Sequence, residues 1–272
     1  MDALTATAAA GIRSRVEALD LLANNLANAN STGYKADREL YRRYAADQAY
    51  DATTGAFDPT QQPDIDSRWT DFSQGAFATT GEPLDVALEG KGFFVVTGQS
   101  IGGQTSAGEA SPKPELLYTR DGHFRLVPVE AEANNTVLGR RSRLETQDGF
   151  TVIGNEGKPI LLDPRRPVEF GRDGTVRQDG LVVNRLLVAD PGAPQQLQKR
   201  SGNYFALDSP TAVPRSTTAQ VQQGKLETAN VTPAESAVRL INVMRQFESL
   251  QKALQIGGEM NRRSVEEVAK FT

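Results

Sequence analysis

Apolar residues recur at helical spacing between Thr232 and Phe271. The stretch opens with Thr232, which can cap free amides, Pro233, which suits the first helical position, and Glu235, which is placed to complete a capping box. Alternating steps of three and four residues then connect the apolar positions, with Gln251 as one polar interruption. These positions are Ala237, Leu240, Met244, Phe247 and Leu254. The pattern predicts a helix over 233–272 whose heptad seam needs a partner helix.

The other end of the chain carries a second apolar pattern of the same period, over residues 4–30. Its positions step by four, three, four and three, and Leu22 widens the stripe that they make. They are Ile12, Val16, Leu19, Ala23 and Leu26. Gly33 follows as a stop signal. An ordinary surface helix is the simpler interpretation, but two seams of equal period at opposite termini favour two helices that pair.

Between the two helical stretches the pattern changes to that of strands. Leu84, Val86 and Leu88 alternate with other residues, and a dense apolar run follows at 93–96. Asp-Gly pairs, which signal tight turns, stand at 121–122, 148–149, 173–174 and 179–180. The clearest expected hairpin is 118–126. The sequence therefore predicts a mainly-β domain over 73–208, with projecting loops at 98–114 and 131–141.

The resulting prediction is an α+β chain: a mainly-β central domain flanked by long N- and C-terminal α-helices that pair with each other and with neighbouring subunits. We expect the N-terminal helix at 1–32, an extended linker at 33–72, the β domain at 73–208, a return linker at 209–232 and the C-terminal helix at 233–272. Within one subunit, one set of residues is expected to form the seam: Ile12, Val16, Leu19 and Leu26 against Leu240, Met244, Phe247 and Leu254. A second set then remains for neighbouring subunits: Leu22, Val238, Ile241, Val243 and Leu250.

Charge and composition narrow the possible partners. There are 30 basic and 34 acidic residues, giving a net charge of −4, and no basic cluster stands out. A nucleic-acid or anionic-membrane surface is therefore not expected. No apolar run is long enough to span a bilayer, and the N-terminus lacks the layout of a cleaved Sec signal. With no cysteine, thiolate chemistry and thiolate metal sites are excluded.

Candidate chemistry is sparse. The single histidine, His123, stands beside an Asp-Gly turn, and Gly90-Lys91-Gly92 lacks the residues that complete a phosphate loop. We therefore expect no catalytic, cofactor-binding or metal-binding residues, no small-molecule substrate, and no enzymatic activity. Two other classes remain open: a soluble coiled-coil homodimer, and a hydrolase that uses a carboxylate pair on cell-wall glycan.

Four sequence blocks carry a resemblance to a known family. They are LANNLANANSTGYK at 22–35, TDFSQG with TGEPLDVALEGKGFF over 70–94, YTRDGHFRL at 118–126 and QGKLETANV at 223–231. Together they span nearly the whole chain, and it resembles the bacterial flagellar basal-body rod and hook proteins. The residues that match the family's N-terminal signature are Asn24, Asn25, Leu26, Ala27, Asn28, Gly33, Tyr34 and Lys35.

The resemblance implies a structural, non-enzymatic subunit of the flagellar rod, whose terminal helices build a hollow helical tube with the β domain outside. It implies copies of itself and other rod proteins as partners, with export by the flagellar type III apparatus rather than through a cleaved Sec signal. The expected location is the rod of the basal body, which crosses the periplasm. Within the family the chain looks most like the proximal rod member that adjoins the distal rod, with a distal rod or hook-type subunit as the alternative.

Overall fold

The computed structural model describes residues 3–42, 64–98, 115–129, 141–192, 197–207, 215–216 and 218–268. The expected loop residues 99–114 and 131–140 lie outside this set. The chain divides into two compact units. The helical unit comprises 1–29, 36–71 and 231–272, and the β unit comprises 30–35 and 72–230. With a helix at each end and a mainly-β centre, the predicted α+β class is confirmed.

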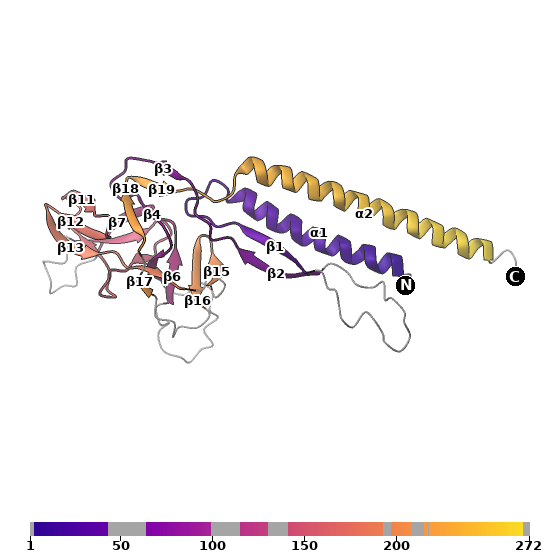
Figure 1. Cartoon of the computed structure of the whole chain (residues 1–272), viewed down its shortest axis with the longest axis horizontal. Coiled ribbons are helices and arrows are strands. Elements are labelled where there is room, and N and C mark those ends of the chain that lie inside the picture. The colour runs from indigo at the N-terminus through magenta and orange to yellow at the C-terminus, as the bar shows by residue number, and fades with distance from the viewer. Residues whose placement is uncertain are drawn as a thin grey trace, which may run out of the picture. The chain divides into compact units, whose positions relative to one another are not determined.

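The helical unit contains two helices and one strand pair. Helix α1 (Ala3–Ala27) and helix α2 (Pro233–Val268) lie side by side, and α2 extends past α1 toward the C-terminus (Figure 1). Strands β1 (Asp37–Arg42) and β2 (Asp64–Thr70) pair antiparallel with a bulge after Leu40. Helix α1 contacts both this strand pair and α2, so it packs on two sides.

Helix α2 begins as the sequence predicts. The Thr232 hydroxyl accepts a hydrogen bond from the Glu235 amide at 3.2 Å, which satisfies one of the free donors of the first turn. The Glu235 carboxylate does not complete a capping box: it pairs with Arg239 at 2.8 Å, one helical turn later. The helix then continues without a break through Gly257 and Gly258.

The β unit is built on a ten-stranded sheet in which β10, β8, β9, β5, β6, β16 and β15 follow one another, while β7 pairs with β8, β14 with β5, and β17 with β14. The strands of this sheet are β5 (Phe93–Gly98), β6 (Glu115–Thr119), β7 (Phe124–Pro128), β8 (Ser142–Thr146), β9 (Thr151–Val152), β10 (Leu161–Leu162), β14 (Val188–Asp190), β15 (Leu197–Ser201), β16 (Tyr204–Leu207) and β17 (Arg215–Ser216). A second, three-stranded sheet contains β11 (Val168–Phe170), β12 (Thr175–Gln178) and β13 (Leu181–Arg185).

Paired strands also occupy both ranges that the sequence predicts as extended linkers. The first range holds β1 and β2. In the second, β18 (Gln220–Gln223) pairs with β4 (Val86–Glu89), and β19 (Lys225–Glu227) pairs with β3 (Phe77–Thr79). Val221 and Leu226 are buried there among polar neighbours. One apolar residue per strand is too short a pattern to recognise, so these strands are visible only once their partners are known.

The dense apolar run of β5 forms the centre of the β unit. Phe94 and Val96 belong to the larger buried cluster, whereas Phe93 and Val95 belong to a second cluster. Because neighbouring side chains of a strand point to opposite faces, this strand is covered on both faces. An uninterrupted apolar run is the expected sequence for such a strand.

Three of the four Asp-Gly pairs lie in connections between paired strands. Asp179 and Gly180 both have positive φ, 51° and 77°, as a two-residue turn between β12 and β13 requires. The hairpin expected at 118–126 is wrong, because β6 pairs with β5 and β16 while β7 pairs with β8. A Cβ on Gly122 would lie 1.7 Å from the Val86 carbonyl oxygen, so the glycine there allows a close chain crossing instead.

Candidate functional site

Helix α1 buries a different face from the one that the sequence predicts. Its buried residues are Ser14, Ala18, Leu21, Leu22 and Asn25. Of the expected stripe, Val16 is 42% exposed and Ala23 is exposed, whereas Ile12, Leu19 and Leu26 are partly buried. The prediction that Val16 is buried in a seam is therefore wrong. Leu22 was expected to remain for neighbouring subunits, but it is only 6% exposed, so that expectation is wrong as well. The buried face combines Leu21 and Leu22 with the small or polar Ser14, Ala18 and Asn25, which apolar periodicity does not detect.

Two contacts show how α1 packs within the helical unit. A Cβ on Gly11 would lie 3.5 Å from Leu250 Cδ1, an ordinary contact distance, so this position of α1 faces α2. Asn25 exchanges two hydrogen bonds with the backbone of Asp37 in β1: its Nδ2 donates to the carbonyl at 2.7 Å, and the Asp37 amide donates to Oδ1 at 3.0 Å. This side chain satisfies backbone groups of a bordering strand.

Helix α2 also departs from its predicted seam. Ala237 is partly buried as predicted, and from Leu240 onward the partly buried apolar residues step by three, four, three and four: Leu240, Val243, Phe247, Leu250 and Leu254. Met244, expected in the seam, is 46% exposed, whereas Val243 and Leu250, expected to be left for neighbours, are partly buried. The corrected seam is a better heptad because it passes through Leu250 and avoids the polar interruption at Gln251.

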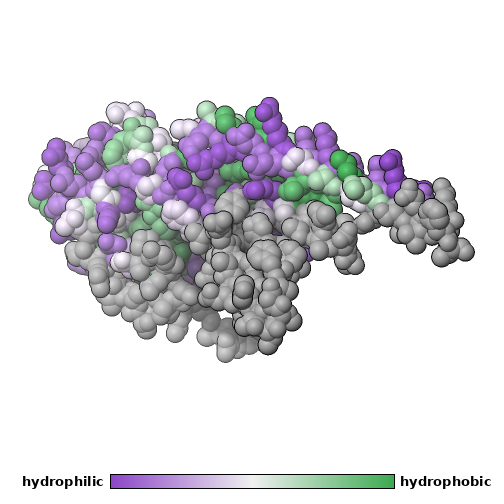
Figure 2. Space-filling model, turned by 45° about the vertical axis from the view of Figure 1, so that its right-hand side comes forward, coloured by the Kyte–Doolittle hydropathy of each residue, from purple (hydrophilic) through white to green (hydrophobic). Residues whose placement is uncertain are grey.

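Apolar side chains therefore remain on the surface of both helices. On α2 they include Val238, Ile241 and Met244, which are 59%, 50% and 46% exposed. Figure 2 shows hydrophobic surface in green among the hydrophilic surface in purple. On α1 the exposed residue is Val16, which is 42% exposed, and the partly buried stripe residues Ile12, Leu19 and Leu26 accompany it. We call these two sets together the helical stripe. An apolar surface that is not used for folding within the chain is typical of a protein–protein contact.

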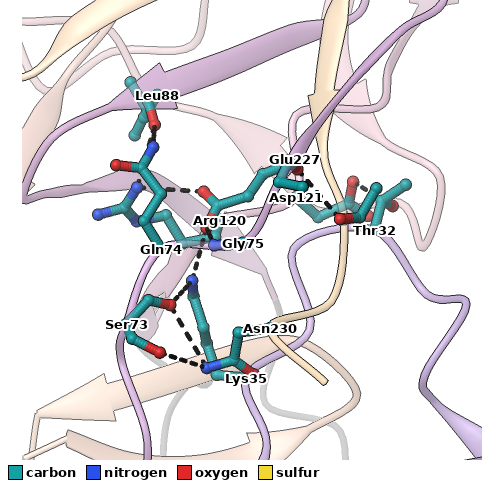
Figure 3. Close-up of polar contacts among 12 residues, drawn as sticks. Thr32, Lys35, Ser73, Gln74, Gly75, Leu88, Arg120, Asp121, Glu227 and Asn230 are labelled. Atoms are coloured by element: carbon teal, nitrogen blue, oxygen red, sulfur yellow. Dashed lines mark hydrogen bonds and ion pairs between the residues drawn. The ribbon is translucent and has the colours of Figure 1, made fainter. Parts of the chain in front are cut away.

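A group of buried charged side chains lies in the β unit (Figure 3). The Lys35 Nζ is 2.6 Å from Glu227 Oε1, and both side chains are fully buried. Arg120 Nη1 is 3.1 Å from Glu227 Oε2. Burial lowers the pKa of the Arg120 guanidinium, and the nearby Glu227 carboxylate opposes that shift. We call Lys35, Arg120 and Glu227 the charge clasp.

Backbone groups complete the charge clasp. The Gly75 amide donates to Glu227 Oε1 at 2.9 Å, and Lys35 Nζ donates to the Ser73 carbonyl at 2.7 Å. Arg120 donates to the carbonyl oxygens of Leu88 and Gly90 at 3.2 and 2.6 Å. Each charged group thus has hydrogen-bond partners besides its ion pair, which burial of a charge requires.

The signature residues next to Lys35 are also held in the β unit. Gly33 has φ of 66°, and a Cβ there would lie 2.4 Å from the Asp121 amide nitrogen. The Tyr34 ring is buried, with Lys199 Nζ 4.2 Å from its centroid. By contrast Asn24 and Ala27 are exposed, and Asn28 donates to the Asn24 carbonyl at 2.9 Å near the end of α1.

Arg120 and Glu227 lie inside two of the family-like sequence blocks, but neither block predicts a role for them. A charged residue in a mixed polar segment carries no sign that it is buried, and the pairing of Glu227 with Lys35 spans 192 positions. One sequence signal could have suggested this pair: Lys35 and Glu227 carry opposite charges and lie in two separate family-like blocks.

Known proteins match this chain at both ends and over most of its length. The family model for flagella basal body rod proteins matches residues 3–35, and the model for the C-terminal region of the flagellar basal body rod FlgEFG proteins matches 222–266. The flagellar basal-body rod protein FlgF of Caulobacter vibrioides is 33% identical over 93% of this chain and 92% of its own length. FlgF of Mesorhizobium japonicum is 28% identical (85% and 83% covered), and the rod protein FlgG of Borreliella burgdorferi is 26% identical (93% and 94% covered).

The chain belongs to the flagellar basal-body rod protein family, whose members are structural subunits of the flagellar basal body.

Proposed function

We propose that this chain assembles through α1 and α2, as a non-enzymatic subunit, into the hollow helical tube of the flagellar rod. The observation that carries the proposal is the helical stripe. Val238, Ile241 and Met244 stay about half exposed although α2 already packs on α1. A fully buried side chain of this kind contributes about 1.5–3 kcal/mol, so several partly exposed ones together can hold a neighbour.

Repetition explains how such a stripe gives a tube. A contact between two different surfaces of identical subunits continues from one subunit to the next, and without closure it produces a helical filament. The helical stripe includes distinct surfaces on α1 and α2, which is the arrangement that a head-to-tail contact requires. In this proposal the helix pair is a unit of the inner tube.

The partners that we propose are copies of this chain and other flagellar rod proteins. Two of the relatives described above are named FlgF. The similarity to FlgF of Caulobacter vibrioides extends over more than nine tenths of each of the two chains. This supports the proximal rod member that adjoins the distal rod over a distal rod or hook-type subunit. Delivery through the flagellar type III export apparatus, without a cleaved Sec signal, belongs to the same proposal. Among the described residues, no helix is long and apolar enough to cross a membrane.

The glycan-hydrolase alternative has little support in the β unit. A groove of about 550 Å³ is lined by residues that include Arg172, Asp173 and Arg185. Asp173 is the sole carboxylate among the described residues that line it. Hydrogen bonds from the Thr175 hydroxyl and amide hold the pKa of Asp173 below its usual range. Glycoside cleavage needs two carboxyl groups, one of which stays protonated as the acid, and this groove offers neither condition.

The assembly proposal is tested by placing a charge in the helical stripe. Ile241→Asp puts a carboxylate on the stripe, and Asn242→Asp, at the next exposed position, is the matched control. Both variants are expected to keep the circular dichroism of the free chain. In cells that lack the native chain, Ile241→Asp is expected to give isolated basal bodies whose rod stops early in electron micrographs, with loss of motility.

The control Asn242→Asp is expected to restore a full rod. Normal rods and motility with Ile241→Asp would overturn the assignment of the stripe, and normal rods without any copy of the chain would overturn the function. Size-exclusion chromatography addresses the homodimer alternative. A stable dimer that does not grow further at high concentration would favour a simple coiled coil over open-ended assembly.

A further inference from the structure

The chain passes between its two units at four points: after 29, 35, 71 and 230. Within the β unit, the residues next to these points are bonded to one another. The Asn230 amide donates to the Tyr34 carbonyl at 3.3 Å, and its Nδ2 donates to Ser73 at 3.2 Å. The Gly33 amide donates to the Glu227 carbonyl at 2.7 Å. All the segments that lead toward the helices are thus held at one site, which contains the charge clasp (Figure 3).

The charge balance of the clasp is uneven. Two cations, Lys35 and Arg120, share one carboxylate, Glu227, and the Lys35 and Glu227 side chains are fully buried. Without that carboxylate, docking of Lys35 would bury a second positive charge close to Arg120 and lack the one carboxylate that both cations contact. Asp190 also favours the Arg120 cation electrostatically, but the effect of Glu227 is the larger one. Burying an unpaired charge is strongly unfavourable, and two like charges make it worse. We therefore expect the Lys35 side chain to stay solvated until Glu227 is in place.

Glu227 is placed by strand pairing late in the chain. It is the last residue of β19, where it pairs with Phe77 of β3, and the adjoining β18 pairs with β4. The Gly75 amide, just before β3, donates to its side chain at 2.9 Å. The carboxylate thus reaches the clasp only when the return segment 220–227 has added its two strands to strands from the first part of the β unit.

We propose that the charge clasp closes late. In this view the signature segment 30–35 docks in the β unit only after the return segment 220–227 has paired, so that both ends of the chain leave the β unit from one site fixed in a single step. The inference concerns folding order, goes beyond the assembly function and does not depend on it. Its consequence is that a chain whose C-terminal part has not yet arrived keeps its N-terminal junction open.

Hydrogen exchange on the full chain tests the clasp at equilibrium. Glu227→Gln keeps the size of the side chain but removes the counter-charge, and it is expected to speed amide exchange in 30–35 at least tenfold while 93–96 stays protected. Asp179→Asn, which breaks the exposed pair of Asp179 with Arg166, is the matched control and is expected to change exchange less than twofold. Unchanged protection of 30–35 in Glu227→Gln would overturn the proposal.

A second variant keeps the test decisive even if Glu227→Gln folds poorly. Lys35→Met leaves one cation with one carboxylate, so this chain is expected to fold with β3 and β19 paired. In the Lys35→Met background, adding Glu227→Gln is expected to change the exchange of 30–35 several-fold less than it does in the native chain. Equal effects in both backgrounds would show that the two charges act independently.

Pulse labelling during refolding tests the order itself. The native chain is expected to protect 30–35 no earlier than 220–227. In Lys35→Met, where no buried cation awaits Glu227 in this segment, the delay is expected to shorten. Protection of 30–35 before 220–227 in the native chain would overturn late closure.

Discussion

In the β unit, Leu88, Phe94 and Leu144 have no exposed surface, whereas on α2 of the helical unit Val238 and Ile241 keep half or more of theirs. The β unit closes two apolar clusters with its own strands. The exceptions among its described residues are Leu116 of β6 and the strand β13, whose Leu181 and Val182 lie exposed at the edge of the three-stranded sheet. The helical unit, by contrast, has more apolar helix surface than its own elements cover.

This difference separates folding from assembly. Two helices and one strand pair offer few surfaces, and each helix carries apolar residues around more than one side, so one partner cannot cover them all. A sheet covered on both faces has no such surplus. We therefore expect substitutions in the β unit to act on the stability of the single chain, and substitutions in the helical stripe to act on contacts between chains.

The largest effect is expected in the core of the β unit. Phe94→Ala removes a buried ring whose centroid is 5.2 Å from that of Phe124, and it is expected to lower the free energy of unfolding by about 3–5 kcal/mol. Urea unfolding followed by circular dichroism measures this. Leu116→Ala, at a half-exposed position of β6, serves as control and is expected to cost much less. Similar losses for the two variants would contradict the contrast between core and surface.

An intermediate effect is expected at the contact between the helices. Leu250 lies beside Gly11 and is partly buried, so Leu250→Ala is expected to lower the stability of the helical unit by about 1–2 kcal/mol. Met244→Ala, on the helical stripe, is expected to change it by less than about 0.5 kcal/mol. Hydrogen exchange of α2 in dilute chain distinguishes the two positions. A larger loss for Met244→Ala would restore the seam that the sequence predicts.

The smallest effect is expected at Asp121. Its Oδ1 accepts hydrogen bonds from the Thr32 hydroxyl at 2.8 Å and the His123 amide at 3.1 Å, and asparagine keeps this acceptor. Burial raises the pKa of the Asp121 carboxyl, more than these bonds lower it. The stability linked to this group is therefore present at acidic pH, below the pKa of the unfolded chain, and is lost as pH rises through the higher pKa of the folded chain.

Asp121→Asn removes that ionisation. Relative to the native chain, the variant is expected to gain stability on going from about pH 3 to pH 7, by less than about 1 kcal/mol. Thermal unfolding at the two pH values measures the difference. A variant that loses stability over the same interval would mean that the ionised carboxylate, rather than the neutral acid, is the form that the fold favours.

Features were predicted correctly from the sequence where neighbouring residues determine them, and were missed where residues distant in sequence do. The run at 93–96, the cap at Thr232 and the turn at Asp179-Gly180 are local, so the residues themselves identify them. Most of the buried face of α1 was missed because three of its residues, Ser14, Ala18 and Asn25, are small or polar and give no clear apolar period. The hairpin turn expected at Asp121-Gly122 was wrong because the glycine is needed for a close contact with the Val86 carbonyl, and Val86 is distant in sequence.

The charge clasp could not be predicted from the sequence for the same reason. Neither Lys35 nor Glu227 shows in its own neighbourhood that it is buried, and only the folded chain brings them together. On the helices, the sequence identified the surplus of apolar residues but assigned part of it to the wrong side. The amount of apolar surface is a property of composition, whereas the face that it covers depends on the partner.

The ion pair between Lys35 and Glu227 also has a consequence for how this chain varies among related genes. The two residues stand 192 positions apart, one in each of the two regions that family models match. Loss of Glu227 alone leaves Lys35 buried beside Arg120 without the carboxylate that they share, whereas loss of Lys35 alone leaves Glu227 paired with Arg120. An exchange of the two charges would set a lysine at 227 beside Arg120. Joint replacement is the path with the smaller penalty. The residues at positions 35 and 227 are therefore expected to covary across related sequences. Such covariation in an alignment would indicate that the two positions are in contact.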